Sequence, residues 1–152
     1  MCITISGAHI QLSTQKLGVV FLEDPDKCTH LVSKGIFRTP KFVRAMCVAK
    51  FAVNPSWLED SAEAGRLLRE SLVFILLPTQ SFLAAEESYW ISDEEKENRF
   101  KFSLKEVFAM NRSTPVLQDI TIYATEHIGM DVETLKHVVI SAGGQVSLFH
   151  HL

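Results

Sequence analysis

Arg38 and Lys41 stand on either side of Thr39-Pro40, where the sequence turns from a loop into a helix. Thr39 can cap this helix with its hydroxyl, and Pro40 suits the first helical position because an N–H there has no helical partner. The predicted helix has one apolar face, formed by Phe42, Ala45, Met46 and Ala49. The two cations therefore lie beside the N-terminus of a helix.

A helix N-terminus favours anions, because its first N–H groups are unpaired and the helix dipole is positive there. Arg38 just before the cap and Lys41 in the first turn strengthen that preference. The sequence predicts that this corner binds a phosphorylated peptide and that the rest of the chain positions it.

The composition indicates that any anion-binding site is local, because the chain as a whole is not basic. The 152 residues are 47% hydrophobic and 22% charged, as in a globular chain, and the net charge of −3 argues against a general nucleic-acid binder. Cys2, Cys28 and Cys47 form no CxxC pair, which indicates a reducing compartment and no structural zinc. With no signal-peptide pattern and no apolar run longer than 72–77, we expect a soluble, intracellular protein.

The first 65 residues alternate between strand and helix patterns. Strands are predicted at 1–5, 19–22, 29–32 and 51–53. Helices are predicted at 9–17, at about 40–49, and from a cap at Asn54-Pro55 to a stop at Gly65. This order indicates a small parallel α/β domain.

The rest of the chain is predicted to contain an apolar insertion, a connecting segment with a helix, and the start of a second copy of the first unit. Residues 71–85 are apolar without a clear period, and 86–98 are acidic. Ser103 to Glu106 is a capping box that opens a helix ended by Pro115. A strand at 120–125, a helix at 131–142 and a strand at 145–148 repeat the order of residues 2–22, so a second copy begins and stops early.

Five segments resemble successive landmarks of tandem BRCT domains: Cys28–Val32, Arg38–Phe42, Asn54–Leu58, Phe100–Leu104 and Ile122–Val146. The resemblance implies an α/β BRCT fold, with a small parallel four-stranded sheet flanked by helices, then a linker helix and an incomplete second BRCT unit. The implied boundaries are 1–70 for the first domain, 71–98 for an apolar insertion and acidic linker, 99–115 for the linker helix and 116–152 for the N-terminal part of the second domain.

The resemblance also implies a site. In this family a Ser or Thr hydroxyl and a backbone N–H after the first strand hold the phosphate, together with a Lys early in the second helix. That Lys corresponds to Lys41, and the hydroxyl to Thr4 or Ser6, with Gly7 beside them. Arg38 falls where histone-tail readers place an Arg on the peptide's terminal carboxylate, whose geometry suits a planar guanidinium. Thr39 caps the helix beside the site.

The implied function is that of a phosphopeptide-binding adaptor of the DNA damage response, in the nucleus and on chromatin. Its implied partner is a phosphorylated protein such as a histone-variant tail, with no membrane or sequence-specific nucleic acid. We expect no enzyme, because phosphate-binding glycine motifs and a local nucleophile–base–acid set are absent, and no cofactor or metal, because His150-His151 has no completing ligand.

Two alternatives stay open. One is a phospho-independent interaction module that binds through residues 72–77 or through Tyr89-Trp90. The other is a truncated isoform in which phosphopeptide binding is impaired. In that case the groove between the two units, which the family uses to read residues beyond the phosphate, has only half its wall.

Overall fold

The computed structural model describes residues 2–3, 17–68, 89–125 and 128–148. Its first sheet has three parallel strands in the order β1 (Cys2–Ile3), β2 (His30–Val32) and β3 (Phe51–Val53). The predicted strands at 29–32 and 51–53 are confirmed. Of the strand predicted at 19–22, Leu22 takes a bridge position within the described residues. The helix predicted at 9–17 and the segment 71–85 lie almost wholly outside the described residues.

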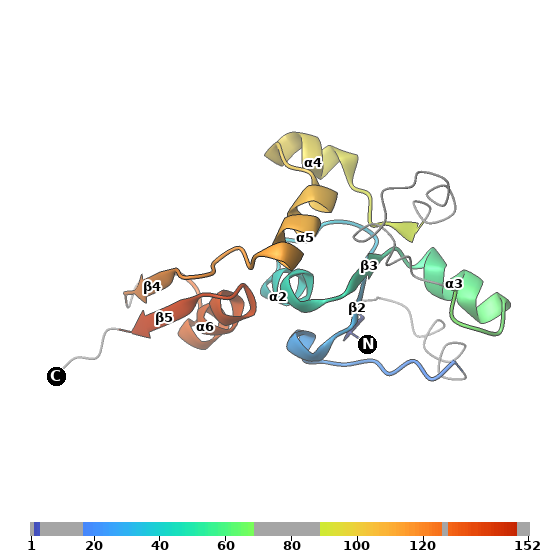
Figure 1. The fold of residues 1–152 in the computed structure, drawn as a ribbon, viewed down its shortest axis with the longest axis horizontal. Helices are drawn as coiled ribbons and strands as arrows, with labels where there is room; N and C mark the ends of the chain where they lie inside the picture. Colours follow the sequence, from blue (N-terminus) through green and yellow to red (C-terminus); the bar gives the residue numbers. More distant parts are fainter. Residues whose placement is uncertain (1, 4–16, 69–88, 126–127, 149–152) are drawn as a thin grey trace.

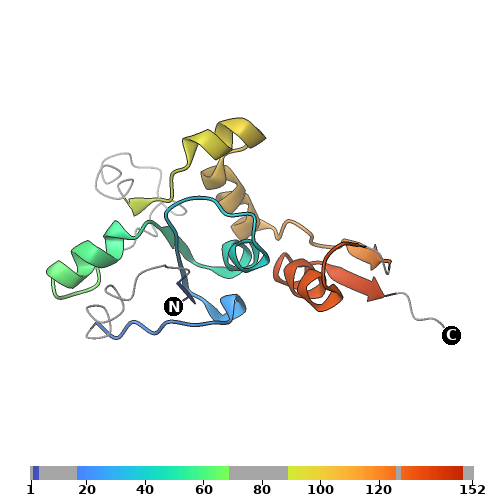
Figure 2. The same ribbon diagram turned by 180° about the vertical axis from the view of Figure 1, so that it is seen from behind.

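Alternating side chains of the short strands build two separate cores. Leu31 and Ala52 pack into one core with Phe42 and Ala45 of α2 (Pro40–Val48). Their neighbours Val32 and Val53 pack into the other with Trp57, which is fully buried. Because successive strand residues point to opposite faces, both faces of this sheet are covered. Figures 1 and 2 show β2 and β3 between α2 and α3.

Helices form where their caps predict them. In α2, Thr39 Oγ1 accepts the Phe42 N–H and Pro40 opens the helix, as expected. In α3 (Ser56–Glu63), Asn54 Oδ1 accepts the Ser56 N–H at 3.1 Å. In α5 (Leu104–Ser113), Ser103 Oγ accepts the Glu106 N–H at 3.4 Å, which confirms the hydroxyl half of the predicted capping box.

The connection before α5 contains a helix that the sequence did not reveal. α4 (Glu94–Phe100) begins at the cap Asp93 and ends at Lys101, whose φ of 53° is left-handed. The short 3-10 helix η1 (Pro25–Lys27) lies earlier in the chain, against α2. The C-terminal end of α2 is held by α5, since Asn111 Nδ2 donates to Cys47 O at 2.8 Å and Arg112 Nη2 to Ala49 O at 3.1 Å.

The last elements repeat the strand–helix–strand order. β4 (Thr121–Ala124) and β5 (Gln145–Leu148) pair in parallel, with Thr121 opposite Gln145, and α6 (Val132–Ser141) connects them. These three elements match the predicted ones to within a residue or so at each end. α6 also packs against α2, so the second unit rests on the helix that carries Lys41 (Figure 1).

Candidate functional site

The N-terminal turn of α2 leaves one backbone donor for a ligand. Pro40 has no N–H, the Phe42 N–H donates to Thr39 Oγ1 at 3.3 Å, and the Val43 N–H donates to Thr39 O at 3.0 Å. Within the described residues, the N–H of Lys41 is therefore the remaining donor of this turn. The sequence predicted several unpaired N–H groups here, and the Thr39 cap pairs that of Phe42.

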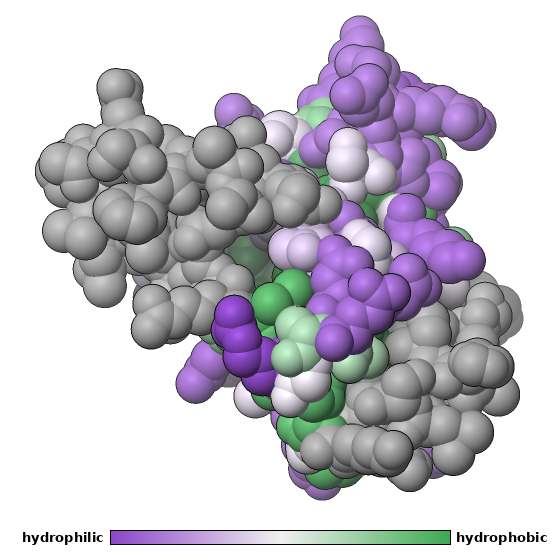
Figure 3. Space-filling view, turned by 90° about the vertical axis from the view of Figure 1, so that its right-hand side faces the viewer, coloured by the Kyte–Doolittle hydropathy of each residue, from purple (hydrophilic) through white to green (hydrophobic). Residues whose placement is uncertain are grey.

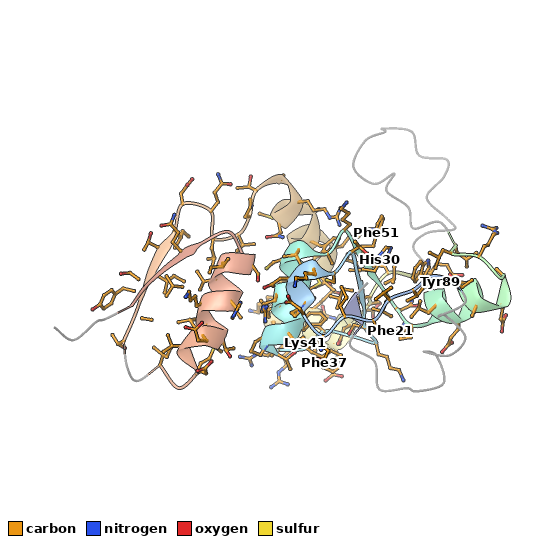
Figure 4. All side chains as sticks on the ribbon, turned by 90° about the horizontal axis from the view of Figure 1, so that it is seen from below. Phe21, His30, Phe37, Lys41, Phe51 and Tyr89 are labelled. Atoms are coloured by element: carbon orange, nitrogen blue, oxygen red, sulfur yellow. The ribbon has the colours of Figure 1, made fainter. Side chains whose placement is uncertain are left out.

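The ammonium of the same residue, Lys41, is free to bind an anion. Among the described residues, no carboxylate or hydrogen-bond acceptor contacts Lys41 Nζ, and the side chain is only partly buried. Figure 4 shows Lys41 and Phe37 at the same edge of the molecule. A cation and an N–H at the positive end of a helix dipole are what a phosphate needs.

Arg38 is exposed and lies against an aromatic ring of another element. Its guanidinium carbon is 5.4 Å from the centroid of the Phe100 ring, at the end of α4. Arg99 approaches the same ring, also at 5.4 Å. No carboxylate of the described residues pairs with Arg38. The prediction that Arg38 pairs with an anion is compatible with this arrangement.

The loop between β2 and α2 fixes where these cations lie. Ser33 is almost fully buried, and its hydroxyl donates to Gly35 O at 2.7 Å. The Ile36 N–H donates to Asp93 Oδ2 at 2.9 Å. Phe37 packs edge-on against Phe42, with ring centroids 6.0 Å apart. The loop is therefore tied to its own strand, to the connection before α5 and to the helix it feeds.

Thr4, Ser6 and Gly7, the predicted phosphate partners from the first strand, lie outside the described residues. The described part of β1 pairs in parallel with β2, with Cys2 opposite Leu31 and Ile3 opposite Val32. β1 and β2 therefore end at the same edge of the sheet, where the loop to Arg38 and Lys41 begins.

Sequence reasoning missed Asp93, Lys96 and Phe100, which touch the loop from α4. Asp93 accepts the Ile36 N–H and also a hydrogen bond from Lys96 Nζ at 2.9 Å. The Lys96 hydrogen bond, and then the Ile36 N–H, hold the pKa of Asp93 below its ordinary value. These three residues are spaced by three and four positions, which is the spacing of one helix face. The sequence was interpreted as an acidic connection, however, and this gave no reason to expect contacts with the loop before α2.

Within the described ranges, no group of three or more His, Cys, Asp or Glu side chains is placed to hold a metal ion. His150 and His151 lie outside those ranges.

None of the described helices has the length and apolarity needed to cross a membrane. The hydrophilic surface of α4 forms the top of the molecule in Figure 3.

A family model described as the Regulator of Ty1 transposition protein 107 BRCT domain matches residues 8–75. PAX-interacting protein 1 of Bos taurus is 32% identical over 130 residues, which are 86% of this chain and 12% of that protein. Mediator of DNA damage checkpoint protein 1 of Rattus norvegicus is 26% identical over 130 residues, 86% of this chain and 9% of that protein. The chain is a BRCT region resembling those of these two proteins.

Solved BRCT structures agree with this fold. The BRCT5-BRCT6 domains of S. pombe Brc1 superpose with a TM-score of 0.71 at 22% identity, over 97% of this chain and 65% of that one. The complex of Rtt107p and a phosphorylated histone superposes with a TM-score of 0.54 at 16% identity, over 97% of this chain and 60% of that one. The fold is the α/β BRCT fold, and this BRCT region spans about an eighth or less of the two curated relatives named above.

Proposed function

We propose that this BRCT region is a phosphopeptide-binding adaptor module, acting in the nucleus in the response to DNA damage. The observation that carries the proposal is that Lys41 offers two donors at the α2 N-terminus, its ammonium and its backbone N–H, and neither has a partner among the described residues. A phosphate there accepts from both, and these charge-assisted bonds are stronger than neutral ones. Thr4 or Ser6, with Gly7, would complete the phosphate contacts.

Arg38 takes the terminal carboxylate of the same peptide in this proposal. It precedes the helix cap, its guanidinium has no carboxylate partner among the described residues, and a planar fork matches a carboxylate. A phosphorylated tail that ends shortly after its phosphoserine, such as that of a histone variant, presents both groups. Support comes from the solved complex of Rtt107p, a relative in fold, with a phosphorylated histone.

The same proposal assigns 1–70 to a first BRCT unit, 71–98 and 99–115 to the connection, and 116–152 to part of a second. A purely hydrophobic docking mode has no specific support. Tyr89 donates from its hydroxyl to Asp60 Oδ2 at 2.6 Å, and Trp90 packs edge-on against Phe108 with centroids 5.3 Å apart. Both aromatic side chains contact their own chain, and residues 72–77 lie outside the described ranges.

The test is a titration of a peptide ending in phospho-Ser-Gln-Glu-Tyr, beside its unphosphorylated twin. We expect the phosphorylated peptide to bind more tightly, and Lys41→Met to weaken it roughly tenfold or more, since a bond to a charged group contributes about 1.5–3 kcal/mol. Affinity should also fall as salt rises.

Lys50→Met is the matched control. It makes the same charge change at an exposed residue after the opposite end of α2. It should leave both affinities unchanged. Equal binding of the two peptides to the unmutated chain and to Lys41→Met would refute the proposed function.

A further inference from the structure

α4 contacts the loop between β2 and α2 at three points along its length. Asp93 at its N-cap meets Ile36, Lys96 lies over Phe37, and Phe100 at its C-terminal end meets Arg38. The three α4 residues are spaced by three and four positions, so they lie on one face of the helix. Going from Ile36 to Arg38, the loop therefore runs along α4 from its start to its end.

The contact at the start of α4 is tight and specific to the backbone. Asp93 Oδ2 accepts the Ile36 N–H at 2.9 Å and pairs with Lys96 Nζ at 2.9 Å. A Cβ on Gly35 would lie 2.7 Å from Asp93 Oδ2, so the carboxylate comes as close as it does because residue 35 is glycine. This end of α4 fixes the loop just before Arg38.

The contacts further along α4 are aromatic and cationic. Lys96 Nζ lies 5.3 Å from the centroid of the Phe37 ring, and the Arg38 guanidinium lies 5.4 Å from that of Phe100. An exposed arginine otherwise samples many rotamers, and ordering it on binding costs affinity. A guanidinium already resting on a ring has lost part of that freedom before the ligand arrives.

We propose that Phe100 is a positioning residue that orients Arg38, which makes α4 the element that sets carboxylate specificity in this BRCT region. The inference rests on the proposed function, because Arg38 is taken to bind the peptide's terminal carboxylate. Phe100 itself contacts no ligand group. It sets how strongly the module prefers a peptide with a free C-terminus over one whose C-terminus is blocked.

The experiment compares the phosphopeptide with a free carboxylate and the same phosphopeptide amidated at its C-terminus. In the unmutated chain we expect amidation to weaken binding about tenfold, the size of one charge-assisted contact. The ratio of the two dissociation constants, amidated peptide over free-carboxylate peptide, should shrink to about threefold in Phe100→Leu. In Phe100→Tyr, which keeps an aromatic ring, this ratio should stay at about tenfold. A loss of stability alone would lower both affinities and leave the ratio unchanged.

Arg99→Gln is the matched control, because it removes a second cation from the same ring. Its ratio should stay near that of the unmutated chain. A decrease as large as in Phe100→Leu would overturn the inference, because the ratio would then follow charge near the ring rather than the orientation of Arg38.

A ratio that is unchanged in Phe100→Leu would also overturn the inference, and it would leave the proposed function standing. The unphosphorylated peptide separates the two ideas. If the unmutated chain does not distinguish it from the phosphorylated one, the proposed function fails.

Discussion

Gly143 and Gly129 both have a positive φ but lie in different surroundings. Both have positive φ, 85° and 66°, but a Cβ on Gly143 would lie 2.4 Å from Pro115 Cβ, whereas a Cβ on Gly129 would meet no atom within 4 Å. Gly143 follows α6 and packs against the connection that leads into the second unit. Its lack of a side chain thus lets α6 and the segment at Pro115 approach closely.

Alanine at these two positions separates backbone strain from the close contact. Gly129→Ala should lower the free energy of unfolding by about 1 kcal/mol, the left-handed penalty alone. Gly143→Ala should lower it by at least about 2 kcal/mol, because a clash with a proline ring adds to that penalty. Urea unfolding of the two variants measures the difference, and equal midpoints would show that the segment at Pro115 moves away freely.

At the scale of elements, α2 and α5 could be predicted from their local caps, whereas α4 was missed despite its cap at Asp93, and the partners that hold these helices could not be predicted. Thr39-Pro40 defined the start of α2, and Ser103 that of α5, because capping depends on residues within three positions. The contact of Asp93 with Ile36 joins residues 57 apart and depends on how the chain folds back. The positions of Arg38 and Lys41 at the start of α2 were therefore predictable, whereas the contact of Arg38 with Phe100 required the structure.

η1 and α2 are joined by an ion pair that sequence reasoning also missed. Arg44 Nε donates to Asp26 Oδ1 at 3.0 Å, and Arg44 Nη2 contacts Asp24 Oδ1 at 3.3 Å. The Arg44 hydrogen bond is the main cause that lowers the pKa of Asp26 from its ordinary 3.8. The pair anchors the middle of the helix that presents Lys41.

This pair predicts an acid-sensitive contribution to stability. Because the folded pKa of Asp26 lies below the unfolded one, the contribution is complete above the ordinary value of 3.8 and is lost as pH falls through the folded value. Asp26→Asn should therefore flatten the decrease of unfolding free energy below about pH 4, measured by urea unfolding from pH 7 downward. Arg44→Met removes the same pair and should flatten the same region. An unchanged slope in both variants would contradict the assignment.

At the scale of the whole molecule, α2 connects the proposed phosphate site to the β4–α6–β5 elements. Its N-terminus carries Lys41, and α6 packs along it (Figure 2). Ser141 Oγ of α6 lies 2.7 Å from Asp26 Oδ1, across 115 residues of sequence, and its proton is shared between this carboxylate and His137 O of its own helix, also at 2.7 Å. His137 Nδ1 lies 3.9 Å from the other oxygen of Asp26. The carboxylate that anchors α2 to η1 is thus also a polar contact with α6.

Removing the Ser141 hydroxyl should loosen this contact without unfolding α6. Ser141→Ala should cost about 1 kcal/mol of unfolding free energy, the net value of one hydrogen bond, and should speed amide exchange in α6 and β5 more than in the first sheet. Ser113→Ala is the matched control, since Ser113 Oγ, at the end of α5, bonds Met110 O of its own helix at 2.8 Å and no other group among the described residues. It should cost less and leave exchange in α6 unchanged. If both variants cost the same, and α6 exchanges alike in both, the Asp26–Ser141 bond does not hold α6 against α2. Their association then depends on the other contacts between these two helices.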